Sequence, residues 1–159
     1  MTSDFRTLSP QQQALLERWL PGARVAADHS WGQVQTTVLE VLHAGTRFIV
    51  KAGGEDDHHI ERELYAHLHW LLPWTSRGRA PALEHGDAGT RILVTRYLPG
   101  RLVLGSDHED DPATYRQAGE LLALFHGQAS GTACWSYRLG IESFEAQGHR
   151  MIAEALAAE

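Results

Sequence analysis

The sequence predicts an α+β fold in which an antiparallel five-stranded sheet with one main helix comes first and a mostly helical part follows. Two observations lead to this prediction. Strand-like segments occur only before residue 98, in the order helix, three strands, helix, two strands, and helical patterns alone follow them. Strands followed by helices favour an antiparallel α+β lobe joined to a helical one. We therefore expect a first lobe over residues 1–98, and a linker with the start of a helical lobe over residues 99–159.

The composition indicates an ordinary globular protein. The chain has 159 residues, 43% of them hydrophobic, and a formal net charge of −6, which argues against a nucleic-acid partner because phosphate-binding surfaces are rich in cations. No apolar run reaches the roughly 18 residues that span a bilayer, and the first residues lack the apolar core of a signal peptide. Cys134 is the only cysteine, so a reducing compartment fits. The sequence thus predicts a cytoplasmic protein without a membrane partner.

The first helix and the first three strands have clear local signals. The helix begins where Ser9 can cap it, Pro10 suits its first turn and Gln12 completes a capping box, and it ends at Pro21-Gly22. The following residues alternate in the manner of strands. Three strands are expected, the last two joined by a turn at His43-Ala44-Gly45: Ala23–Ala27, Gln33–Leu42 and Thr46–Ala52.

A second helix is expected after the polar break Gly53–Asp57. Either Asp56 or Asp57 can cap its start. Apolar residues that recur at helical spacing predict this helix: Ile60, Leu64, Leu68 and Leu71. A loop from Pro73 to Pro81 follows.

A second hairpin and further helices complete the pattern. The hairpin strands are Ala82–Gly86 and Arg91–Tyr97, and Leu98-Pro99-Gly100 ends the sheet. Asp111-Pro112 opens another amphipathic helix, as a cap followed by proline. The last expected segments are a loop over Gly127–Gly140 and a helix over Ile141–Glu159.

Lys51 is the residue that points most directly to a chemistry. In its alternating strand, Phe48 and Val50 face one way, while Ile49 and Lys51 face the other. A lysine that is partly buried there needs an anionic partner. Glu63, on the next helix, is close to the apolar stripe and can point inward. A strand lysine facing such a glutamate forms the pair with which kinases hold nucleotide phosphates, whereas a solvated lysine and a surface glutamate are the alternative.

Two further segments fit a nucleotide site. The turn Asp28–Gln33 lies between the first two strands, where backbone N–H groups can cover phosphates, and it contains Ser30 and Gly32. With this single glycine it does not match GxGxxG. The strand that starts near Ile92 leads into Arg96–Leu98, whose backbone can present donors and acceptors to an adenine edge.

Four segments in this order resemble the aminoglycoside phosphotransferase family. The resemblance extends from Val25 to Gln128 and rests on Phe48-Ile49-Val50-Lys51, Arg62-Glu63-Leu64, the run from Val94 to Gly100, and the run from Gly119 to Gly127. It implies a protein-kinase-like, two-lobed fold that uses ATP or GTP with Mg²⁺.

The resemblance also implies roles for single residues. Lys51 would bind the α- and β-phosphates, and Glu63 would orient Lys51. Glu61 is the alternative to Glu63, and only one of them can do this because two residues of a helix differ by about 200° in direction. The nucleotide-binding segments would be the turn with Ser30 and Gly32, and a hinge made by the backbone of Arg96, Tyr97 and Leu98.

The chain departs from the family at the catalytic loop. The family uses an aspartate and an asparagine in a loop of the form HxDxxxxN, and a later metal-binding aspartate. The one His-Gly-Asp, at residues 85–87, precedes the hinge and has Ile92 where asparagine is required, so we interpret it as a plain turn. No aspartate follows Gly127. We therefore expect the natural protein to continue beyond Glu159, and this chain alone to hold nucleotide without catalysing phosphoryl transfer.

Two functions from different classes stay open. In the first, the chain is the nucleotide-binding half of a kinase that transfers a γ-phosphate to a hydroxyl of a small molecule, an aminoglycoside or another metabolite. In the second, it is a non-catalytic nucleotide-binding or interaction module that covers its interlobe surface, for example by forming a dimer. A metal site is disfavoured, because no HExxH motif occurs, and a solvated helix face is expected instead for His58, His59, His67 and His69.

Overall fold

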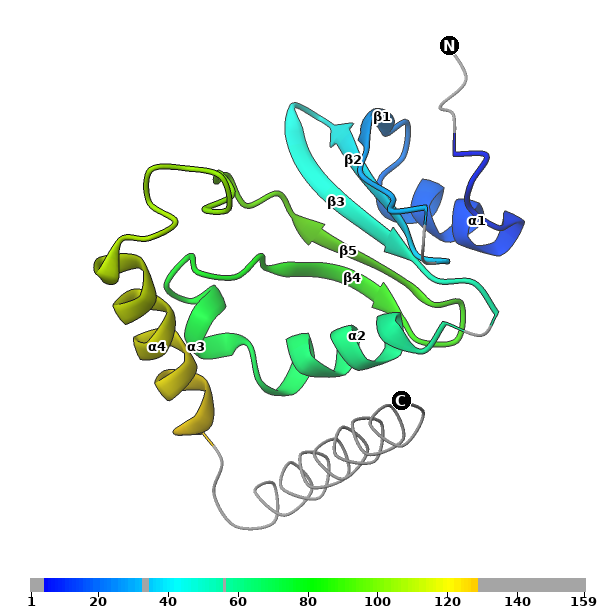
Figure 1. Ribbon diagram of the computed structural model, residues 1–159. Helices are drawn as coiled ribbons and strands as arrows, with labels where there is room; N and C mark the ends of the chain where they lie inside the picture. Colours follow the sequence, from blue (N-terminus) through cyan, green and yellow to red (C-terminus); the bar gives the residue numbers. More distant parts are fainter. Residues whose placement is uncertain (1–4, 33–34, 56, 129–159) are drawn as a thin grey trace, which may run out of the picture. The chain divides into compact units, whose positions relative to one another are not determined.

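The computed structural model describes residues 5–32, 35–55 and 57–128, and it contains a five-stranded sheet. The strands lie in the order β1-β2-β3-β5-β4, with antiparallel neighbours (Figure 1). The predicted fold class, α+β with a five-stranded antiparallel sheet in the manner of a kinase N-lobe, is confirmed. The strands are β1 (Arg24–Asp28), β2 (Thr37–His43), β3 (Thr46–Ala52), β4 (Leu83–Asp87) and β5 (Ile92–Arg96).

Helix α1 (Pro10–Trp19) packs on one face of this sheet. Its predicted capping box is present: the Gln12 N–H donates to Ser9 Oγ, and the Ser9 N–H donates to Gln12 Oε1. The apolar side of α1 meets alternate residues of the central strands. The cluster between them includes Leu16, Leu20, Leu39, Val41, Phe48, Val50, Ile92 and Val94.

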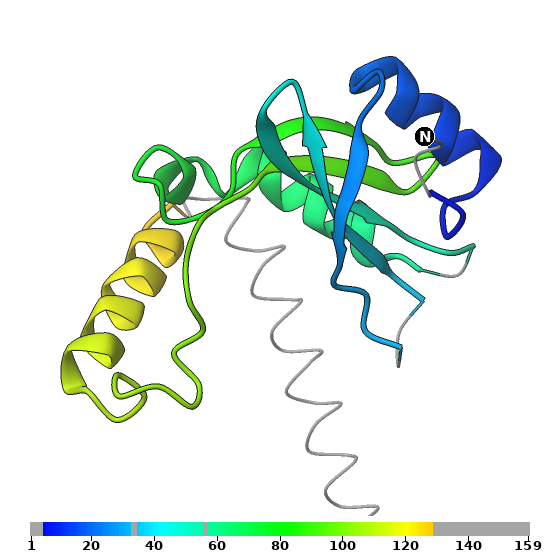
Figure 2. The same ribbon diagram turned by 90° about the horizontal axis from the view of Figure 1, so that it is seen from above.

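Helix α2 (His59–His69) lies on the opposite face of the sheet (Figure 2). Ile60 and Leu64 pack there against Leu93, the residue of β5 that points away from α1. Gly86 of β4 permits a close approach, because a Cβ at that position would lie only 2.4 Å from Leu64 Cδ1. The sheet therefore separates an α1 face from an α2 face.

The start of α2 differs from the prediction. The N-cap residue is His58, and Asp57, one position earlier, still accepts a hydrogen bond from the His59 N–H. Asp56 lies outside the described residues. A short helix, α3 (Leu72–Thr75), occupies part of the segment that was predicted to be a loop.

Of the apolar residues that predicted α2, Leu68 does not share the buried side of Ile60 and Leu64, because it is 63% exposed. Each step of four residues advances around a helix by about 40°, so two steps from Ile60 place Leu68 about 80° from the buried side. His67 lies on the buried side instead, and its side chain is only 2% exposed. The prediction of a solvated helix face is therefore wrong for His67.

β2 starts later than predicted, at Thr37 rather than at Gln33. Residues 33–34 lie outside the described residues. The second residue of β2, Val38, donates its N–H to Ser30 Oγ in the connection that precedes the strand. The pairing of β2 with β1 starts only at Leu39, which faces Asp28. Of the residues before Thr37, Gln35 and Thr36 belong to the connection and not to the strand.

Helix α4 (Pro112–His126) begins as predicted, after Asp111, whose Oδ1 accepts a hydrogen bond from the Ala113 N–H. The chain divides into two compact units, Met1–Thr114 and Tyr115–Glu159. The predicted lobe boundary between residues 98 and 99 stays a prediction. The predicted helix Ile141–Glu159 lies outside the described residues, as does Cys134. Of the helices described, none is long and apolar enough to cross a membrane.

Candidate functional site

Strand β3 brings Lys51 to the α2 face of the sheet, one residue before the strand ends. Three alternate residues of β3 are buried on the α1 face, namely Phe48, Val50 and Ala52. Strand alternation therefore turns Lys51 to the other side. Its neighbours across the ladders are Val38 of β2 and Leu93 of β5. The predicted orientation of the strand is confirmed.

Lys51 Nζ lies 2.7 Å from Glu63 Oε1, and each side chain is 31% exposed. Glu63 reaches the strand because it is on the side of α2 that carries Ile60 and Leu64. Glu61, the alternative partner, lies elsewhere: its Oε1 is 3.3 Å from Nε of Arg91. The structure therefore pairs Lys51 with Glu63, as the first of the two predicted options.

Glu63 has a second neighbour, His67, one turn further along α2. His67 Nε2 lies 3.8 Å from Oε1, the same oxygen that contacts Lys51. Burial raises the pKa of the Glu63 carboxyl, but the contacts with His67 and Lys51 outweigh it and hold this pKa below its usual value. Glu63 is thus an anion held between two nitrogen donors.

Lys51 is also the only lysine of the chain, and the other thirteen residues with permanently cationic side chains are arginines. An ammonium group is a compact point charge, whereas a guanidinium is a planar fork, so the two are not interchangeable at a phosphate. The use of a single lysine in a chain that otherwise uses arginine is a sequence signal for this position, in addition to the motifs described above.

The turn between β1 and β2 is tied to the sheet through Ser30. Its N–H donates to Asp28 Oδ1 at 2.8 Å, and its hydroxyl oxygen accepts from the Val38 N–H at 3.0 Å. Gly32 lies in open space, since a Cβ placed there would meet no atom within 4 Å. Both predicted residues of the turn lie in the connection, and their binding of phosphate stays a prediction.

The predicted hinge residues differ in what their backbone can offer. The Arg96 N–H donates to the Ala82 carbonyl at 2.8 Å and the Tyr97 N–H to the Arg47 carbonyl at 3.1 Å, so both donors are used within the sheet. The Leu98 N–H makes no hydrogen bond to any other residue described, and the Leu98 side chain is exposed. Of the three residues that were predicted to form a hinge, Leu98 is therefore the one whose N–H no other described residue engages.

A buried carboxylate next to the hinge was missed by the sequence reasoning. Glu40 of β2 is buried and accepts from Arg47 Nε at 2.7 Å, and the Arg47 guanidinium lies 3.7 Å above the ring centroid of Tyr97. On its other side, Glu40 Oε2 is 3.4 Å from His29 Nε2, in the β1–β2 turn. Burial raises the pKa of Glu40, but Arg47 and His29 outweigh it and lower this pKa. The network joins the turn to the hinge, and its sequence signal was a single acidic residue within an apolar strand.

A model of the phosphotransferase enzyme family matches residues 25–158. The chain belongs to this family. The predicted resemblance to aminoglycoside phosphotransferases is thereby confirmed at the level of the family. Comparison with the curated proteins and with the solved structures finds no match.

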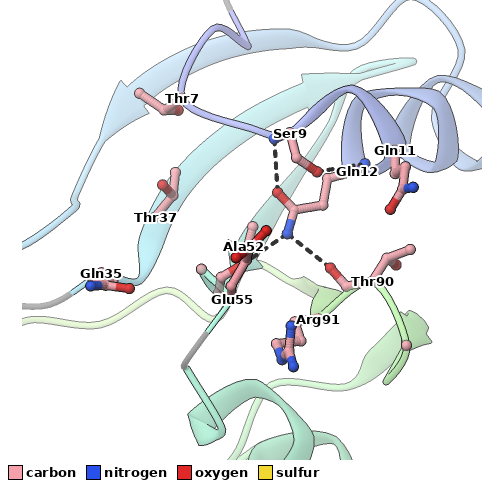
Figure 3. A pocket seen from close by; sticks show the side chains of 13 residues that line it. Thr7, Ser9, Gln11, Gln12, Gln35, Thr37, Ala52, Glu55, Thr90 and Arg91 are labelled. Atoms are coloured by element: carbon pink, nitrogen blue, oxygen red, sulfur yellow. Dashed lines mark hydrogen bonds between the residues drawn. The ribbon is translucent and has the colours of Figure 1, made fainter.

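The chain also has a polar pocket of about 350 Å³ (Figure 3), and this pocket is separate from the Lys51–Glu63 pair. It lies among the start of α1, the residues that follow β3 and the β4–β5 turn, and neither Lys51 nor Glu63 lines it. Gln12 closes one side: its amide group donates to the carbonyls of Gly53, at 3.0 Å, and Thr90, at 2.8 Å. Gln12 therefore fixes the backbone two residues after Lys51.

The His-Gly-Asp triplet lies at the end of strand β4, and not in the turn that was predicted from the sequence. Asp87 Oδ1 accepts hydrogen bonds from the N–H and the hydroxyl of Thr90, both at 2.7 Å. His85 stacks on Trp19 with ring centroids 5.2 Å apart. Asp87 and His85 are thus both engaged in holding the β4–β5 hairpin and α1.

Proposed function

We propose that this phosphotransferase binds ATP or GTP on the α2 face of its sheet, and that the natural protein transfers the γ-phosphate to a hydroxyl group of a small molecule. The proposal rests on the Lys51–Glu63 ion pair. Its nitrogen and oxygen atoms are 2.7 Å apart, and 31% of each side chain is exposed to solvent. An accessible ammonium group whose direction is fixed by a carboxylate is the device with which kinases hold the phosphates of a nucleotide.

The neighbouring residues suit the rest of a nucleotide. In the turn that Ser30 orders, the N–H groups of His29 and Ser30 are engaged, so the N–H groups of Trp31 and Gly32 are the ones proposed to meet phosphate oxygens, as in the turns of other phosphate sites. The Leu98 N–H supplies a donor for the edge of the base. Glu40 and Arg47 hold Tyr97 next to it. In this proposal the base and the phosphates contact opposite ends of the same sheet face.

The described residues fit a nucleotide better than they fit its Mg²⁺. Among them, no group of three or more His, Cys, Asp or Glu side chains is placed to hold a metal ion. Glu63 is engaged by Lys51 and His67, whereas Mg²⁺ in kinases is held by an aspartate and an asparagine of the other lobe. When bound, Mg²⁺ neutralises charge on the phosphates, and we assign no residue of this chain to it.

The sequence supports a second candidate, a nucleotide-binding module without catalysis. No HxDxxxxN motif with the required spacing occurs in the chain, and no aspartate follows Gly127. In this candidate the Lys51–Glu63 pair still binds nucleotide, and the bound state serves recognition of a partner. Both candidates require nucleotide binding, so binding is the first property to test.

The test measures Mg·ATP and Mg·GTP binding to the chain by isothermal titration calorimetry. We expect binding that Lys51→Ala removes and that Arg62→Ala retains, since Arg62 is an exposed cation next to Glu63 and controls for the loss of one charge. Because Lys51 is the only lysine, an acyl phosphate of ATP that acylates amines should label one side chain, and excess ATP should protect it. Equal affinity of the wild type and Lys51→Ala would overturn the proposed site.

A further inference from the structure

Among the histidines of α2, His67 is the one that lies next to the Lys51–Glu63 pair. The side chain is 2% exposed, and Nε2 points to Glu63 Oε1 at 3.8 Å. The other ring nitrogen, Nδ1, is buried and has no hydrogen-bond partner among the described residues. By contrast, His59, about two turns earlier in α2, is exposed. A buried imidazole with one nitrogen at a carboxylate and the other unused needs an explanation beyond packing.

The surroundings of the ring decide which nitrogen carries the proton. A neutral imidazole has one N–H donor and one lone pair. With the proton on Nδ1, a buried donor would lack an acceptor, and a lone pair on Nε2 would face the Glu63 carboxylate. With the proton on Nε2, the donor faces Glu63 Oε1 and only a lone pair is left unpaired. The geometry therefore favours a proton on Nε2.

We propose that His67 is a positioning residue that, as a second contact of Glu63 Oε1, restricts this carboxylate, and so keeps the Lys51 ammonium group aimed at the phosphates of a bound nucleotide. This inference rests on the proposed nucleotide site. A glutamate side chain has three rotatable bonds. With a single hydrogen-bond donor, the carboxylate and that donor can still move together. Two donors that meet at one oxygen, one on β3 and one on α2, restrict the carboxylate.

The distance between His67 and Glu63 is longer than that of a hydrogen bond. At 3.8 Å, the two atoms attract each other but are too far apart for a hydrogen bond. Hydrogen bonds of catalytic sites are often long before the substrate binds, and they shorten in the complex. When phosphate oxygens accept hydrogen bonds from the Lys51 ammonium group, the contact of Lys51 with Glu63 weakens, and the Nε2–H of His67 moves closer to Glu63 Oε1.

The decisive experiment compares two amide substitutions at this position. The amide nitrogen of glutamine reaches the place of Nε2, whereas that of asparagine reaches only the place of Nδ1. We expect His67→Asn to weaken binding of Mg·ADP by about three- to tenfold, the range expected for one ordinary hydrogen bond, and His67→Gln to stay close to the wild type. Adenosine, which has no phosphate, should bind equally well to all three. The control variant is His69→Asn, an exposed histidine on the same helix.

The outcomes separate a positioning role from a structural one. A variant that loses adenosine and Mg·ADP affinity alike has lost structure, and this result would overturn the proposal, as would unchanged Mg·ADP binding in His67→Asn. A wild-type chain that binds neither compound would instead overturn the proposed function. In that case the ¹⁵N chemical shifts of the His67 ring still test the contact: a protonated Nε2 is expected, and a bare Nε2 contradicts it.

Discussion

At the scale of single residues, Lys51 is the one lysine among the fourteen lysine and arginine residues of the chain. This allows a test of whether the site needs an ammonium group or only a positive charge. We expect Lys51→Arg to lose most of the nucleotide affinity, although it keeps the charge and resembles every other cation of the chain. The guanidinium is larger and planar, and Glu63, at 2.7 Å from the ammonium nitrogen, leaves it no room to turn toward phosphates. Calorimetry with Mg·ADP measures the effect, and wild-type affinity in this variant would show that charge alone suffices.

The lowered pKa of Glu63 predicts how the pair responds to acid. Because folding lowers this pKa, the unfolded chain binds the proton more readily than the folded chain does. The contribution of the pair to stability is therefore complete at neutral pH and disappears as the pH falls below about 4. Thermal unfolding of the wild type and of Glu63→Gln at several pH values measures it. The difference in Tm should shrink toward acid, and a constant difference would contradict the assignment.

The residues that the sequence predicted and those that it missed differ in a physical way. Lys51 and Glu63 were predictable, because alternation in a strand and the period of a helix fix where each side chain points. Glu40 and His67 were not, because their importance depends on burial and on partners from other segments. Glu40 meets Arg47 and His29 only after the chain has folded into adjacent strands.

At the scale of elements, the site depends on how closely α2 approaches β4. Gly86 is the contact point, and we expect Gly86→Ala to destabilise the fold by about 1–3 kcal/mol, the usual cost of overpacking, because the new methyl group would overlap Leu64. Urea unfolding measures the change. Gly89→Ala, in the turn of the same hairpin, is the control, since its Cβ would have an ordinary contact of 3.5 Å with Asp87. Equal stability of the two variants would show that α2 can move away freely.

Gln12 joins α1 to the segment that leaves β3. We expect Gln12→Ala to lower the free energy of unfolding by about 1–3 kcal/mol, because the carbonyls of Gly53 and Thr90 and the N–H of Ser9 each lose a partner. Gln11→Ala, an exposed position on the same helix, should change stability by no more than about 0.5 kcal/mol. Denaturant unfolding of both variants measures the two changes. A loss of stability of similar size in Gln11→Ala would show that replacing a glutamine of this helix, and not the loss of the Gln12 hydrogen bonds, lowers the free energy of unfolding.

At the scale of the whole molecule, the order and type of the elements up to the linker were predictable, and their exact ends were not. The order of strands and helices and the capping box of α1 depend on residues close in sequence. The late start of β2, and the short helix α3, depend on side-chain partners and packing that no local pattern contains. The division of labour between two lobes was available only through resemblance to a family, because no residue of the first lobe specifies what the second lobe supplies.

The strongest expectation for the whole chain separates binding from catalysis. The described lobe contains the Lys51–Glu63 pair, but the 159 residues contain no HxDxxxxN loop of the required spacing, and this loop supplies the aspartate that orients an acceptor hydroxyl in kinases. We therefore expect the chain to bind Mg·ATP and to transfer no phosphate. A radiolabelled γ-phosphate assay with a panel of hydroxylated acceptors, aminoglycosides among them, tests transfer, and calorimetry on the same preparation tests binding. Transfer that Lys51→Ala abolishes would show that the chain holds a catalytic group outside the family motif.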